Sequence, residues 1–286
     1  MSLSTVLFLF LAHLGVGIVF TLAFVSREAG VKFFRFNAGL SAILIAMALA
    51  FFEGRAGPGG PGGPGEIVGR EGLGGIGLLA LAVAEAALLF YWATVGRALA
   101  RVRPAVTALA VGGGLLAVVL QAAALATGDT VPMQILTAVS FVSSAVLLGT
   151  TCTAMILGHW YLVIPSLEGR HLQSIVKLHI ASLVIRIVVV GAAVFAGIAL
   201  WEAGPAPSGI DVGTFSGYIM SVDGIFFWQR LLFGLAGPAV LSYLTWETAK
   251  IRSTQSATGI LYVDFFTVVV GEVLAKYLVL ATRVPL

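Results

Sequence analysis

Residues 132–164 read PMQILTAVSFVSSAVLLGTTCTAMILGHWYLVI, and this stretch decides the fold class. It contains no Asp, Glu, Lys or Arg. It is also longer than the roughly 20 residues that an α-helix needs to cross the hydrocarbon core of a bilayer. The stretch therefore predicts a transmembrane helix.

The rest of the chain has the same character. The 286 residues are 59% hydrophobic and only 10% charged, with a mean hydropathy of +1.05, whereas soluble globular proteins are about 25% charged. Too little polar surface remains to cover a water-soluble globule, so we expect an all-α polytopic membrane protein with about eight transmembrane helices. The predicted spans cover residues 3–25, 36–52, 73–95, 104–127, 132–164, 173–201, 217–246 and 256–282.

The charged residues between these spans predict the orientation. Every second turn is rich in basic residues, and such turns lie on the cytoplasmic side. The basic residues of these turns are Arg27, Lys32, Arg35, Arg97, Arg101, Arg103, Arg170, Lys177, Lys250 and Arg252. We therefore expect a protein of the cell membrane with both termini outside. The basic residues form no patch with interleaved aromatics, which argues against nucleic acid as a partner.

The chain divides into two predicted halves. Residues 1–130 would form an N-terminal four-helix unit and residues 131–286 a C-terminal one, giving two four-helix bundles. Residues 52–58 (FEGRAGP), after the second helix, resemble residues 201–205 (WEAGP), after the sixth. Residues 54–72, with repeated Gly-Gly-Pro, predict a flexible outer loop without chemistry of its own.

Two histidines are candidate ligands of a haem. His159 precedes a predicted turn near Glu168 by about nine residues, and His179 follows it by about ten. Equal distance from the turn of a helical hairpin means equal depth, so the imidazoles would face each other as axial ligands of a haem b iron. The alternative is interfacial anchoring, because Trp160 and Tyr161 beside His159 are typical of an aromatic belt.

His13 lies deep in the first predicted helix. A structural, hydrogen-bonded histidine is one interpretation; a haem ligand is the other, if the first helix packs on the second half. The single cysteine, Cys152, excludes a disulfide framework, a cysteine-only zinc site and a cysteine-ligated iron–sulfur cluster within this chain.

Six charged residues lie at membrane depth, where ionisable groups are costly and are functional candidates by default. They are Glu85, Arg186, Arg230, Asp264, Glu272 and Lys276. Lys276 follows Glu272 by four positions, which suits an intrahelical ion pair. The set is interpreted either as structural salt bridges or as a quinone and proton path, in which Asp264, Arg230, Gln229, Tyr262 or His179 would contact the quinone carbonyls.

The sequence Val-Gly-Glu-Val-Leu-Ala-Lys-Tyr at residues 270–277 resembles the last helices of the NrfD and polysulfide-reductase membrane-subunit family. The eight-helix, two-bundle layout is similar as well. The resemblance implies a quinone-interacting membrane subunit that assembles with soluble iron–sulfur and catalytic subunits. The chain departs from the family pattern at Lys276, where an arginine is expected.

Three functions are compatible with these residues. The first is a membrane subunit of a respiratory electron-transfer complex that contacts a quinone and carries haem b. The second is a secondary transporter or channel that uses the charges at membrane depth, and the third is a structural or assembly subunit. The chain has no Walker, Rossmann, Ser-His-Asp or H-E-x-x-H pattern, so a quinone-reactive or non-catalytic subunit is favoured over an autonomous enzyme.

Overall fold

A computed structural model describes residues 3–53, 72–97, 99–126, 130–164, 169–200 and 213–286, and in them it contains helices and no strand. Eight helices are long and apolar enough to cross a membrane. This confirms the predicted all-α polytopic membrane fold. The predicted loop at residues 54–72 lies outside the described residues, except for Gly72, which begins a helix.

The helix bounds agree with the predicted spans to within a few residues at most ends. Six spans are α1 (Leu3–Leu22), α4 (Gly72–Thr94), α5 (Arg103–Leu125), α6 (Val131–Val163), α7 (Gly169–Leu200) and α11 (Thr254–Thr282). The second span is the short turn η1 (Arg27–Ala29) followed by α2 (Gly30–Glu53), and it begins well before the predicted residue 36.

The seventh span differs most from its prediction as one helix over residues 217–246. A separate short helix, α8 (Phe215–Met220), comes first, and the span itself consists of η2 (Val222–Gly224), α9 (Ile225–Leu231), η3 (Leu232–Ala236) and α10 (Gly237–Lys250). η3 is a π-helical turn, in which the Gly237 N–H donates to the Leu232 carbonyl. It ends just before Pro238, which has no N–H for a helical hydrogen bond. The helices described in the first half contain no matching interruption.

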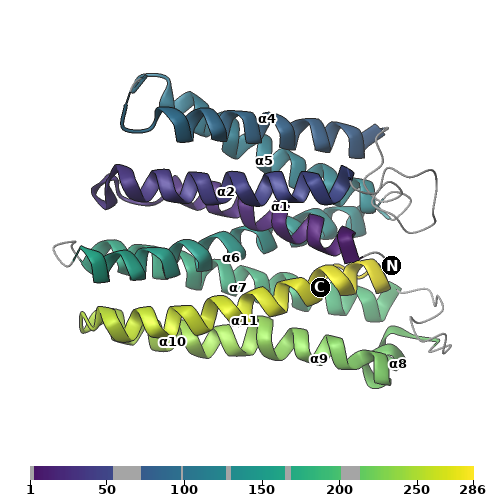
Figure 1. The fold of residues 1–286 in the computed structure, drawn as a ribbon. Coiled ribbons are helices and arrows are strands. Elements are labelled where there is room, and N and C mark those ends of the chain that lie inside the picture. Colours follow the sequence, from purple (N-terminus) through teal and green to yellow (C-terminus); the bar gives the residue numbers. More distant parts are fainter. Residues whose placement is uncertain (1–2, 54–71, 98, 127–129, 165–168, 201–212) are drawn as a thin grey trace.

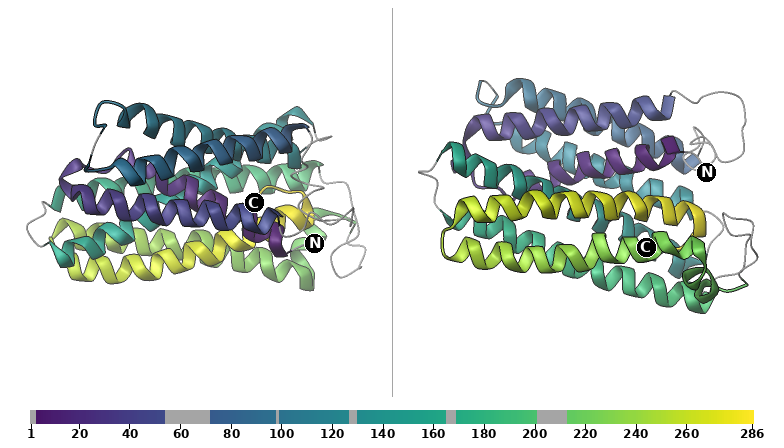
Figure 2. Two further views of the ribbon diagram at one scale, coloured as in Figure 1. Left: turned by 45° about the horizontal axis from the view of Figure 1, so that its top comes forward. Right: turned by 60° about the horizontal axis from the view of Figure 1, so that its bottom comes forward.

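The spans run side by side as one bundle, with both termini at the same end (Figure 1). The α4–α5 hairpin forms one edge, and α9, α10 and α11 lie toward the other (Figure 2). α1 is almost wholly buried and contacts α2, α5, α6 and α11. α6 contacts helices of both predicted halves, so the halves pack against each other along it.

Two glycines bring α1 and α6 together. A Cβ atom on Gly17 would lie 1.9 Å from the Ala145 carbonyl oxygen, and one on Gly149 would lie 2.0 Å from the main chain of Gly17. Small residues allow this close approach of helix backbones, which is a main source of helix association in lipid.

Candidate functional site

His179 of α7 and Asp264 of α11 are in direct contact in the interior of the bundle. Asp264 Oδ2 lies 2.8 Å from His179 Nε2, and both side chains are fully buried. The hydroxyl of Thr151 in α6 lies 3.0 Å from His179 Nδ1, and that of Ser242 in α10 lies 2.9 Å from Nε2. Four helices therefore hold this imidazole, and both of its ring nitrogens are occupied.

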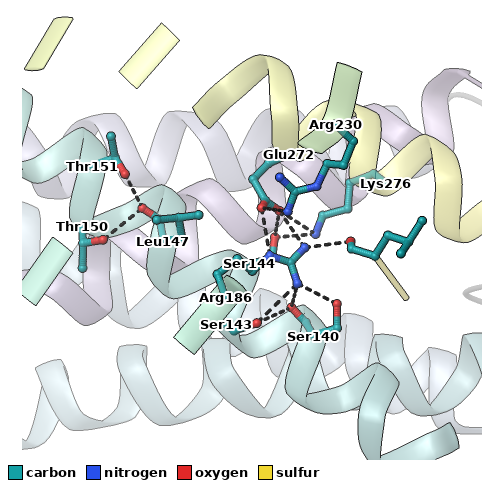
Figure 3. Close-up of polar contacts among 11 residues, drawn as sticks. Ser140, Ser143, Ser144, Leu147, Thr150, Thr151, Arg186, Arg230, Glu272 and Lys276 are labelled. Carbon is teal, nitrogen blue, oxygen red and sulfur yellow. Dashed lines mark hydrogen bonds and ion pairs between the residues drawn. The ribbon is translucent and has the colours of Figure 1, made fainter. Parts of the chain in front are cut away.

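A second buried group converges on Glu272 of α11 (Figure 3). Arg186 of α7 donates from Nε to Glu272 Oε1 at 3.0 Å and from Nη2 to Oε2 at 3.2 Å. Arg230 of α9 donates from Nη2 to Oε1 at 2.8 Å. We call Arg186, Arg230, Glu272 and Lys276 the central cluster.

Lys276 joins the central cluster through a hydroxyl. Its Nζ donates to Ser144 Oγ of α6 at 2.6 Å, and Ser144 donates in turn to Glu272 Oε2. The direct distance from Lys276 Nζ to Glu272 Oε2 is 3.8 Å, which confirms the predicted pair. Three cationic side chains thus face one carboxylate.

Arg186 and Arg230 differ in how completely they are hydrogen-bonded. Arg186 Nη1 donates to the carbonyl and hydroxyl of Ser140, and its Nη2 also donates to the main-chain oxygen of Leu286 at 2.9 Å. Arg230 Nε and Nη1 have no hydrogen-bond partner within the described part of the chain. Arg230 packs where η3 crosses α11, since a Cβ on Gly234 would lie 1.7 Å from its Nη1.

The structure brings together five of the six charged residues predicted at membrane depth, in two groups. Asp264 pairs with His179, and the other four form the central cluster. Asp264 and Glu272 are eight residues apart on α11, which separates the groups by about 12 Å along the helix. Glu85 of α4 joins neither group, and its buried Oε2 has no partner among the described residues.

The prediction that the imidazoles of His159 and His179 face each other at equal depth is wrong. His179 lies level with Thr151, eight residues before His159, which places the two histidines about 12 Å apart along α6. The reason is the position of the turn: α6 ends at Val163 and α7 already begins at Gly169, so the hairpin is centred earlier than the predicted Glu168. His159 is exposed and lies 3.2 Å from the Tyr262 hydroxyl through its Nδ1.

These contacts do not fit a bis-histidine haem site. Both nitrogens of His179 are engaged by neighbouring side chains, which leaves none for an iron. Among the described residues no group of three or more His, Cys, Asp and Glu side chains is placed to hold a metal ion.

His13 is fully buried on α1, and its ring lies edge-on to Phe141 at 4.9 Å. Lys276 Nζ lies 5.1 Å from the same Phe141 ring. Neither His13 nitrogen has a hydrogen-bond partner in the described chain. Gln121 of α5 is the polar side chain that faces the His13 ring, so the hydrogen-bonded role of His13 stays a prediction, and α1 packs on the second half as the alternative required.

The hydroxyls of α6 were missed by the sequence analysis. Ser140, Ser144 and Thr151 all contact one of the two groups. Their spacings of four and seven residues put them on one helix face. A polar stripe of this kind in an otherwise apolar helix was the available signal.

A groove of about 480 Å³ lies between α7 and α10, and it is separated from the buried His179 by Ser242. Its walls are mostly apolar, and Ser242, which contacts His179, is part of the lining. Lys177 and Trp246 also line it, and Lys177 Nζ lies 5.2 Å from the Trp246 ring. Val184, on the groove wall, is 54% exposed, so the groove opens on the outer surface of the bundle.

The chain matches no protein-family model, and it gives no significant match to a curated protein. The likeness of residues 270–277 to the NrfD and polysulfide-reductase membrane subunits thus stays a prediction.

Proposed function

We propose that this membrane protein is a quinone-interacting subunit of a respiratory electron-transfer complex, with the quinone ring bound in the groove between α7 and α10. The observation that carries the proposal is Ser242, which lines the groove and contacts the buried His179–Asp264 pair. Quinone chemistry needs an apolar route from the lipid and a group that exchanges protons with the ring oxygens. The groove would provide the apolar route, and the His179–Asp264 pair would provide the group that exchanges protons.

The charge distribution suggests where the partner subunits bind. The basic turns lie at the end of the bundle nearer to His179 and Asp264, and by the positive-inside rule this end is cytoplasmic. Both termini would then lie on the outer side of the cell membrane. We expect electrons to come from or go to a soluble partner at the cytoplasmic end.

The experiment is photolabelling in lipid nanodiscs with an azido-quinone that carries an isoprenoid tail. We expect labelled peptides from α7 or α10, and competition by unlabelled decylubiquinone. Val184→Trp should fill the groove and reduce labelling at least tenfold. Val188→Trp is the matched control, because Val188 is on the same helix, is 66% exposed and does not line the groove.

Labelling spread over other helices, or equal labelling of the two tryptophan variants, would refute a quinone site in this groove. An optical spectrum of the purified protein tests the haem separately, since a bound haem b changes its absorption on reduction.

A further inference from the structure

Each of the two hydroxyls beside His179 also lies within hydrogen-bond distance of a carbonyl of its own helix. Thr151 Oγ1 is 2.7 Å from the Leu147 carbonyl oxygen, and Ser242 Oγ is 2.6 Å from that of Pro238. A carbonyl oxygen can only accept, and a hydroxyl has one hydrogen. A hydroxyl that donates to its carbonyl therefore acts as an acceptor in its second contact.

Those second contacts are the two nitrogens of His179, at 3.0 Å from Thr151 and 2.9 Å from Ser242. If both hydroxyls accept, then both ring nitrogens donate. An imidazole with hydrogens on both nitrogens is the charged imidazolium form. The hydrogen-bond directions around the ring thus define its protonation state.

Asp264 supplies the balancing charge. Its Oδ2 lies 2.8 Å from Nε2, but neither of its oxygens accepts a hydrogen bond from a described residue. The Nε2 hydrogen is therefore directed at Ser242, and the Asp264 contact is ionic. No other titratable side chain of α6, α7, α10 or α11 forms an ion pair with His179 in the described residues. Arg186, the other charged member of the site on α7, follows His179 by seven residues, or about two helical turns.

We infer that His179 is stored as an imidazolium by Thr151 and Ser242, and that the site can give this proton to a quinone bound in the groove. The transfer to a quinone rests on the proposed function, whereas the protonation state does not.

The proton passes through Ser242, which lies between His179 and the groove. Its hydroxyl turns from the Pro238 carbonyl to a quinone oxygen, its O–H bond breaks as the quinone O–H bond forms, and it takes the Nε2 hydrogen. Two electrons come from a reduced one-electron carrier on a partner subunit, acting twice. The sum of this step is Q + 2e⁻ + H⁺ → QH⁻, and a water then gives the second proton in QH⁻ + H₂O → QH₂ + OH⁻.

The test of the stored proton is nitrogen NMR of the full chain in nanodiscs, labelled with ¹⁵N-histidine, at pH 7. The His179 signals are identified by their loss in His179→Gln. We expect two protonated ring nitrogens in the parent protein and a neutral ring in Thr151→Val, with the imidazolium restored in Thr151→Ser. The matched control is Thr150→Val, because the Thr150 hydroxyl contacts Ser182 rather than His179. Circular dichroism establishes that each variant folds; if Thr151→Val does not, Ser242→Ala gives the same comparison at Nε2.

A neutral His179 ring in the parent protein would overturn the inference, as would an imidazolium in both Thr151→Val and Ser242→Ala. Electrochemical reduction of bound decylubiquinone should convert the imidazolium signal into that of a neutral ring. If decylubiquinone does not bind while the imidazolium is seen, the proposed function fails and the stored proton stands. If decylubiquinone binds while the His179 ring is neutral, the stored proton fails and the proposed function stands.

Discussion

Replacing Glu272 by glutamine tests whether the central cluster holds the bundle together. The substitution keeps the size of the side chain and removes its charge. Glu272 accepts from Arg186 at 3.0 and 3.2 Å and from Arg230 at 2.8 Å, and it also accepts from Ser144. Without it, three buried cations face one another and no acidic side chain of the cluster remains.

The expected loss is large because removal of one partner from a buried ion pair costs about 3–5 kcal/mol. At about 1.4 kcal/mol per factor of ten, this shifts the unfolding equilibrium by about two to four orders of magnitude. The assay is unfolding in mixed detergent and SDS micelles, followed by circular dichroism. Glu272→Gln should unfold at a clearly lower SDS fraction than the parent protein.

The matched control is Glu85→Gln. Glu85 is 8% exposed and its Oε2 has no partner in the described chain, so glutamine breaks no ion pair there. We expect a change within about 1 kcal/mol. Adding Arg230→Met to Glu272→Gln should recover part of the loss, since it removes one uncompensated charge. Equal destabilisation by Glu272→Gln and Glu85→Gln, or no recovery in the double variant, would refute the reasoning.

Three further substitutions test other contacts. Gly149→Ala should lower the thermal unfolding temperature strongly, because its Cβ would meet the Gly17 main chain at 2.0 Å, whereas Gly112→Ala, which meets nothing within 4 Å, should not. Trp160→Phe should cost about 1 kcal/mol in the SDS assay through loss of its 3.1 Å hydrogen bond to the Ala29 carbonyl. Lys276→Met should be neutral or stabilising in the same assay, because Glu272 keeps both arginines; a loss as large as that of Glu272→Gln would contradict this.

The eight spans could be predicted because a run of apolar residues longer than the bilayer core has few other stable environments. The ends of the spans were harder to predict from the sequence. α7 begins with Gly169 to Gln173, a stretch that includes Arg170, His171 and Gln173 and belongs to the helix although it lies near its end. Hydropathy alone places such residues in a turn, and this shift led to the wrong depth for His159 relative to His179.

The charged residues of the site could be predicted one by one, since each is costly in lipid, but most of their pairings could not. Only the Glu272–Lys276 pair lies within one helix, at a spacing that the sequence displays. The stripe of Ser140, Ser144 and Thr151 shows which face of α6 is polar but not what each hydroxyl contacts, because in membrane helices serine and threonine often bond to their own backbone. Thr137 does so with the Met133 carbonyl, whereas Thr151 bonds to its own helix and also contacts His179.

The His179–Asp264 pair and the central cluster lie on the same two helices, α7 and α11, and the distance between them allows their charges to interact. Once His179 has given up its proton, Asp264 remains as a buried anion without a cationic partner. A cation about 12 Å away interacts with that anion by about 1.4 kcal/mol at an effective dielectric constant of about 20, or about tenfold in an equilibrium. The same residues that hold the helices together therefore lie within electrostatic range of the Asp264 carboxylate.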